Sequence, residues 1–146
     1  MKILFVCAQN VGRSQMAAAF YNKMTGTQDA DSAGTNVDQP GQTLSERAGG
    51  VSAADKLLIA MDEEGIDLRD KVRTPLSEAM LTKYDLVINM AEPEKTPDYL
   101  AQYVGCVRWD IVDPKGKDEN TLIMVRDQIK HRVRHLIDSS NVAPQP

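Results

Sequence analysis

A cysteine and an arginine six positions apart stand near the start of the sequence, in the stretch Cys7-Ala8-Gln9-Asn10-Val11-Gly12-Arg13-Ser14. An apolar run at residues 3–6 precedes this stretch and an alanine-rich run at residues 15–24 follows it, which predicts a strand, a tight loop and a helix in that order. The backbone N–H groups of such a loop and of a helix N-terminus form a concave site that binds anions. We therefore predict that the backbone of residues 8–13 binds an oxyanion beside the thiol of Cys7.

Four side chains of this stretch suit nucleophilic chemistry. The positive field of the loop favours the thiolate of Cys7 over the thiol, which makes it a nucleophile. The planar guanidinium of Arg13 can bind two oxygens of a tetrahedral oxyanion, and the hydroxyl of Ser14 can donate a hydrogen bond to the sulfur. The amide of Asn10 is suited to pair with backbone groups that a tight loop leaves unsatisfied.

The rest of the chain alternates strands and helices, which predicts an α/β domain with a mostly parallel sheet. We expect a three-layer sandwich, with a central four-stranded parallel sheet and helices on both faces, over residues 1–138, and a flexible tail over 139–146. The predicted strands are residues 2–6, 30–33, 84–90 and 104–109, and the predicted helices are residues 13–24, 52–64, 75–81, 97–103 and 119–137. In such sheets ligands bind at the carboxyl ends of the strands, which is where Cys7 lies.

Composition and charge exclude several classes of function. The net charge of −4 argues against nonspecific binding to nucleic acid or to an acidic membrane. No apolar stretch approaches the ~18 residues that span a bilayer, and no charged-then-apolar leader is present, so we expect a cytoplasmic protein with neither a nucleic acid nor a membrane as partner. His131 and His135 are spaced as metal ligands on a helix, but no third ligand is evident and basic residues flank them, so we predict no metal site.

The stretch from Cys7 to Ser14 resembles the signature of the low-molecular-weight protein tyrosine phosphatase superfamily, which includes thiol-dependent arsenate reductases. The resemblance extends over about residues 1 to 138. A thiolate that displaces an alcohol from phosphate needs an acid to protonate the departing oxygen, and the general acid of the family is the Asp of an Asp-Pro pair. Asp113, which precedes Pro114 after the last predicted strand, matches that residue; the alternatives are a turn-opening Asp113 and Asp110 as the acid.

The resemblance does not distinguish a phosphatase from an arsenate reductase, because arsenate has the shape and charge of phosphate and the same loop would bind either anion. Reduction needs further thiols, and residues 90–92 hold no cysteine where thioredoxin-coupled reductases carry a resolving pair. Many relatives also have a cysteine where this chain has Gly12. Reduction would therefore depend on an external thiol or on Cys106, which we predict to be a small buried thiol, with a redox role as the alternative.

Two other segments resemble the reductase branch more closely, namely residues 13–16 and residues 109–116. Phosphatases of the family carry aromatic residues after the Asp-Pro pair and in the rim loop, whereas here Lys115 follows the pair and residues 36–44 hold no aromatic. We therefore expect the apolar walls that favour an aryl ester to be missing.

From these observations we predict a phosphomonoesterase that forms a cysteinyl-phosphate on Cys7, with Asp113 as acid and then as base, and that needs no cofactor. The first alternative is an arsenate reductase that uses the same loop with an external thiol reductant and a thiol-redox partner. The second is a domain that binds an oxyanion without turnover. The predicted substrate is a phosphate ester or arsenate.

Overall fold

The computed structural model describes residues 1–49 and 53–140. Its centre is a four-stranded parallel sheet in the order β2 (Ala30–Gly34), β1 (Ile3–Cys7), β3 (Leu86–Asn89) and β4 (Cys106–Arg108). Cys7 pairs with Gly34 of β2, and Val6 pairs with Asn89 of β3. The carboxyl ends of the three strands therefore meet at one edge of the sheet, which is the edge where a ligand is expected.

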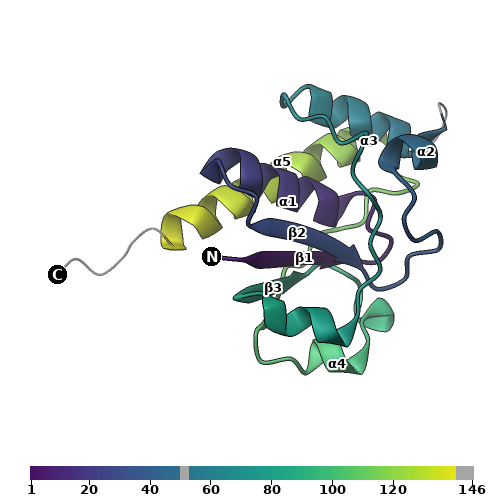
Figure 1. The fold of residues 1–146 in the computed structure, drawn as a ribbon. Helices are drawn as coiled ribbons and strands as arrows, with labels where there is room; N and C mark the ends of the chain where they lie inside the picture. The colour runs from purple at the N-terminus through teal and green to yellow at the C-terminus, as the bar shows by residue number, and fades with distance from the viewer. Residues whose placement is uncertain (50–52, 141–146) are drawn as a thin grey trace.

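Helices cover both faces of the sheet (Figure 1). On one face lie α1 (Arg13–Thr25), α2 (Leu44–Ala48), α3 (Ala53–Asp62) and α5 (Glu119–Ser140). The other face is covered by the 3-10 helices η1 (Glu78–Lys83) and η2 (Pro93–Lys95) and by α4 (Asp98–Ala101). The predicted α/β sandwich with four parallel strands is confirmed.

The alternation of side chains along β1 explains the two hydrophobic cores. Ile3, Phe5 and Cys7 lie in the core under α1 and α5, whereas Leu4 and Val6 lie in the smaller core on the other face. All five side chains are buried, as expected for a central parallel strand that is covered on both sides. The strand that carries the thiol is thus the most enclosed part of the chain.

The element boundaries differ from the predicted ones at two places that matter. The helix predicted at residues 75–81 begins only at Glu78, because the backbone of residues 74–76 hydrogen-bonds on both sides of Gly34 instead. Helix α5 runs to Ser140, so the first two residues of the predicted tail are helical, and residues 141–146 lie outside the described residues. Residue 52, the predicted start of α3, lies outside them as well.

Within the two described ranges, no helix combines the length and the apolar character that crossing a bilayer requires.

Candidate active site

The loop between β1 and α1 is held in shape by the side chain of Asn10. This residue is fully buried and has a φ of 57°, in the left-handed region. Its Nδ2 donates to Ser14 Oγ at 2.8 Å and to Ser32 Oγ at 2.9 Å, and its Oδ1 accepts from the backbone N–H of Thr74 at 2.7 Å. The Asn10 side chain thus joins the loop to α1, to β2 and to residue 74, and the backbone group among these partners belongs to Thr74 and not to the loop itself.

Ser14 lies between Asn10 and the thiol. Its Oγ is 3.0 Å from Cys7 Sγ, and both side chains are buried. Because the hydroxyl accepts from Asn10, its own hydrogen is available for the sulfur, and we assign Ser14 as the donor. A thiolate at Cys7 would be stabilised by this bond.

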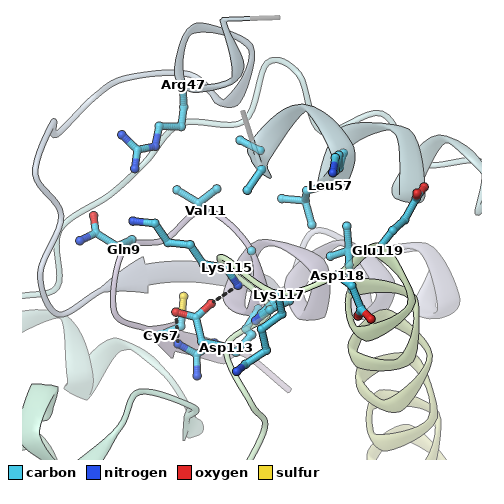
Figure 2. Close-up of a pocket in the computed structure, with 17 residues that line it drawn as sticks. Cys7, Gln9, Val11, Arg47, Leu57, Asp113, Lys115, Lys117, Asp118 and Glu119 are labelled. Carbon is cyan, nitrogen blue, oxygen red and sulfur yellow. Dashed lines mark hydrogen bonds and ion pairs between the residues drawn. The ribbon is translucent and has the colours of Figure 1, made fainter. Parts of the chain in front are cut away.

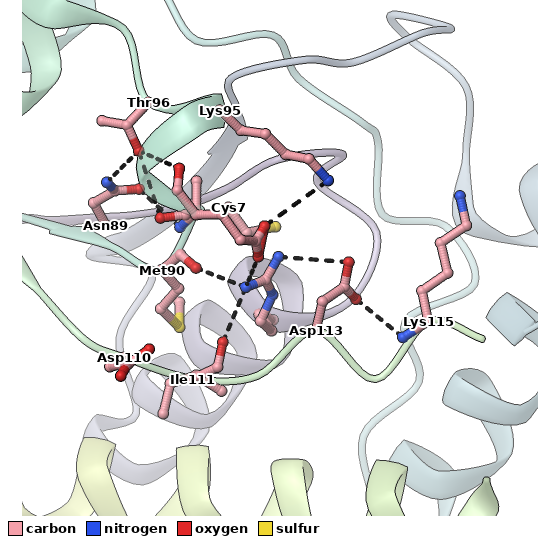
Figure 3. A network of polar contacts seen from close by, with 12 residues as sticks. Cys7, Asn89, Met90, Lys95, Thr96, Asp110, Ile111, Asp113 and Lys115 are labelled. Carbon is pink, nitrogen blue, oxygen red and sulfur yellow. Dashed lines mark hydrogen bonds and ion pairs between the residues drawn. The ribbon is translucent and has the colours of Figure 1, made fainter. Parts of the chain in front are cut away.

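Arg13 is anchored through one of its terminal nitrogens. Nη1 donates to Met90 O at 2.6 Å, to Glu92 Oε1 at 2.7 Å and to Ile111 O at 3.0 Å, and the side chain is 3% exposed (Figure 3). Among the described residues, Nε has no hydrogen-bond partner, and Nη2 lies 3.7 Å from Asp113 Oδ2. The Nε–Nη2 edge of the fork is thus the one that can bind two oxygens of an oxyanion.

Glu92 is a site residue that the sequence pattern did not indicate. Burial raises its pKa, but the hydrogen bond and the charge of Arg13 outweigh burial, so the pKa is held below its usual value. Its other oxygen, Oε2, is buried without a hydrogen bond and lies 3.9 Å from Lys95 Nζ. Glu92 therefore carries a negative charge that balances Arg13 from behind the oxyanion site. The signal that could have found it is its position just after a buried strand, at the carboxyl edge of the sheet.

Asp113 faces the same cavity as Cys7 (Figure 2). Its Oδ1 accepts from the backbone N–H of Lys115 at 3.0 Å. Asp113 therefore both opens a turn, as the alternative interpretation expected, and lies near the thiol. Asp110, the alternative acid, does not line this cavity; its side chain is 94% exposed and lies 3.9 Å from Arg108. The structure brings Asp113 and not Asp110 to Cys7.

The cavity over the thiol has a volume of about 350 Å³. Its walls include the aliphatic side chains of Val11, Leu57 and Leu122, and no aromatic residue lines it among the described residues. The aromatic walls that favour an aryl ester are thus missing from this lining, as expected, and α3 and α5 supply aliphatic walls in their place.

Cys106 is separated from Cys7 by the sheet. Cys106 is half-buried against the smaller core, and burial raises the pKa of its thiol, whereas Cys7 belongs to the core on the opposite face. In the register of the sheet Cys106 is level with Leu4, and β3 lies between β4 and β1, so about 10 Å separates the strands alone. A disulfide requires Cα atoms within about 7 Å, so Cys106 cannot serve Cys7 without rearrangement.

A buried arginine that the sequence pattern did not indicate also holds the loop between β1 and α1, which we call the oxyanion loop (residues 8–12). Arg73 has no exposed surface, and its Nη2 donates to Gln9 O at 3.0 Å and to Gln9 Oε1 at 2.7 Å. Its Nη1 pairs with Asp38 at 2.7 Å. The carbonyl of Gln9 is thereby held away from the anion-binding side of the loop.

Across the described ranges, no group of three or more His, Cys, Asp and Glu side chains is arranged to hold a metal ion.

Comparisons with known proteins show which family the whole chain resembles. The family model described as low molecular weight phosphotyrosine protein phosphatase matches residues 2–144. The chain is 31% identical over 144 residues to a putative arsenate reductase of Halobacterium salinarum, covering 96% of this chain and 93% of the relative. It is 28% identical to a glutaredoxin arsenate reductase of Synechocystis, covering 93% and 95%. A low molecular weight protein tyrosine phosphatase of T. tengcongensis superimposes with a TM-score of 0.74 at 25% identity, covering 95% and 99%.

Proposed function

The chain belongs to the low molecular weight phosphotyrosine protein phosphatase family, and on this premise we propose that it is a phosphomonoesterase that acts through a cysteinyl-phosphate. Its relatives make it an enzyme of the phosphatase or the arsenate reductase kind. The observation that carries the choice of phosphatase is that the thiol of Cys7 and the carboxylate of Asp113 face the same cavity, while the second thiol of the chain, Cys106, lies across the sheet.

The proposed reaction has two steps. In the first, Cys7 Sγ attacks phosphorus, the ester P–O bond breaks, and Asp113 gives its proton to the departing oxygen. In the second, Asp113 takes a proton from water as the water oxygen attacks phosphorus, and the P–S bond breaks to return the thiolate. The N–H groups of the loop and the Nε–Nη2 edge of Arg13 hold the other phosphate oxygens in both steps, and no cofactor takes part.

The Asp113→Asn variant tests the proposal. For an ester whose alcohol is a poor leaving group, we expect the kcat of the variant to fall about 10²–10⁴-fold, because the alcohol oxygen must depart without a proton. The loss should be smaller for nitrophenyl phosphate, and affinity for phosphate should change little. Asp110→Asn is the matched control and should keep full activity, with Cys7→Ser as the blank. Equal rates for the two Asp variants would contradict the assignment of the acid.

Arsenate reduction is the second candidate, favoured by the names of the curated relatives. Since no thiol of the described chain lies near Cys7, the two electrons would have to come from external thiols, which would be oxidised to a disulfide. Arsenate-dependent oxidation of added glutathione or glutaredoxin, lost in Cys7→Ser and without release of alcohol from phosphate esters, would replace the phosphatase proposal. Turnover of either kind would exclude a domain that only binds an oxyanion.

A further inference from the structure

The cavity beside the oxyanion loop is locally positive in an acidic protein. Five of its lining side chains are cationic and three are acidic, although the whole chain has a net charge of −4. Arg13 belongs to the oxyanion site already described. The remaining cations therefore need another explanation.

Three lysines of this lining have no carboxylate partner. Among the lysines that the structure describes, Lys95 and Lys130 form ion pairs, whereas Lys56, Lys115 and Lys117 form none. All three side chains are exposed at the mouth of the cavity. Their charges are thus available to a ligand.

Arg47 and Lys115 form a cationic side of the cavity next to the oxyanion loop, and Asp118 and Glu119 lie on another side. Figure 2 shows Arg47 and Lys115 approaching the space above Gln9 and Val11 from opposite sides, and the acidic pair at the start of α5 away from them. Asp118, one of that pair, is engaged by the helix, because its Oδ1 accepts from the backbone N–H of Thr121 at 2.9 Å and from its hydroxyl at 2.6 Å.

Gln9 adds a neutral donor to the cationic side. Its Oε1 is fixed by the buried Arg73, so its side-chain N–H groups are the part left for a ligand. Within the described residues these N–H groups have no hydrogen-bond partner. The hydrogen-bond donors for a second anion therefore start at the oxyanion loop itself, with the side chain of Gln9.

We propose that Lys56, Lys115 and Lys117 form a second anion subsite, and that the preferred substrate is a phosphomonoester with another carboxylate or phosphate close to the phosphorylated group. The proposal rests on the proposed phosphatase function and names its substrate class. The aliphatic walls at Val11 and Leu57 would contact the carbon framework between the two anionic groups.

Two pairs of substrates test the proposal and distinguish the sources of the second anion. One pair is a phosphotyrosine peptide flanked by Asp and Glu and the same peptide with Asn and Gln; the other is carboxyphenyl phosphate and carbamoylphenyl phosphate. At low salt we expect kcat/KM to favour the acidic member by about three- to tenfold, and the preference to shrink in 0.5 M NaCl. A preference in the peptide pair alone indicates an acidic protein segment, and a preference in both pairs indicates that a small diacid suffices.

The Lys115→Gln/Lys117→Gln variant should lose most of the preference while it keeps its rate on the neutral substrates. Lys2→Gln/Lys83→Gln removes the same charge from exposed sites near the amino ends of β1 and β3, at the opposite edge of the sheet, and should keep the preference. Equal kcat/KM for acidic and neutral substrates in the unchanged protein would overturn the subsite and leave the phosphatase standing. If no ester is turned over, the proposed phosphatase function is wrong. The subsite is then tested by calorimetric measurement of the affinities of the Cys7→Ser protein for the two peptides, and equal affinities would overturn it.

Discussion

Replacing Asn10 with Ala should damage both the stability of the fold and the chemistry of the thiol. The substitution removes the donor to Ser14 and Ser32 and the acceptor for the N–H of Thr74 in one step. No water can reach the vacated position easily, because Asn10 has no exposed surface. The freed groups are thus left without partners inside the protein.

The magnitude follows from two costs. A buried N–H that loses its partner costs ~1–3 kcal/mol, here at Thr74. Alanine is also less tolerant than asparagine of the left-handed φ of 57°, which adds ~1 kcal/mol. We expect a loss of ~3 kcal/mol in the free energy of unfolding, which for a chain of this length lowers Tm by about 6–12 °C.

The effect on chemistry comes through Ser14. Without the donor from Asn10, the hydroxyl of Ser14 is no longer directed at Cys7 Sγ, so the sulfur loses a hydrogen bond and kcat falls about tenfold. Thermal unfolding measures the first effect, and the rate of iodoacetamide alkylation of Cys7 measures the second.

Two further variants separate the contributions of the amide. Ser32→Ala removes a single partner of Asn10 and should lower Tm by only a few degrees. Asn10→Asp keeps an acceptor for Thr74 but cannot donate to Ser14 and brings a negative charge near the thiol, so it should lose more activity than stability. An Asn10→Ala protein with unchanged Tm and an unchanged alkylation profile would refute the role given to this side chain.

The parts of the site that could be predicted from the sequence are those encoded within one continuous segment. The strand, the loop and the start of α1 follow each other directly, so the apolar run and the spacing from Cys7 to Arg13 were enough to place the thiol at the carboxyl edge of the sheet. Asp113 could be placed because an Asp-Pro pair after a strand marks a loop at the same edge.

The parts that could not be predicted depend on contacts between distant segments. In the sequence, Arg73 is one of several charged residues in a polar loop, and nothing there indicates burial. Only the folded structure shows that it is fully buried against Gln9, 64 positions away. Leu57 is buried on the inner face of α3, but whether that face also reaches the cavity depends on how α3 packs beside α5. A periodic pattern determines which face is buried and not which neighbour buries it.

Two more substitutions test how the loop is supported. In Gly34→Ala, the added Cβ would lie 2.6 Å from Ala8 O and 2.9 Å from the backbone nitrogen of Asn10, so the oxyanion loop must shift. We expect the free energy of unfolding to fall by ~2 kcal/mol and vanadate to bind at least about tenfold more weakly. Unchanged vanadate binding would contradict the close contact between Gly34 and the loop. In Glu92→Gln, the charge that balances the buried Arg13 is lost. Because the folded-state pKa of Glu92 is held below its usual value, the pair stabilises the fold fully above the pKa of an unfolded glutamate and loses this stabilisation as the pH falls through the lower, folded-state value. The variant should therefore have a lower Tm than the unchanged protein at pH 7, with a gap that closes as the pH falls below about 4. A gap that is independent of pH would show that Glu92 acts through its shape and not through its charge.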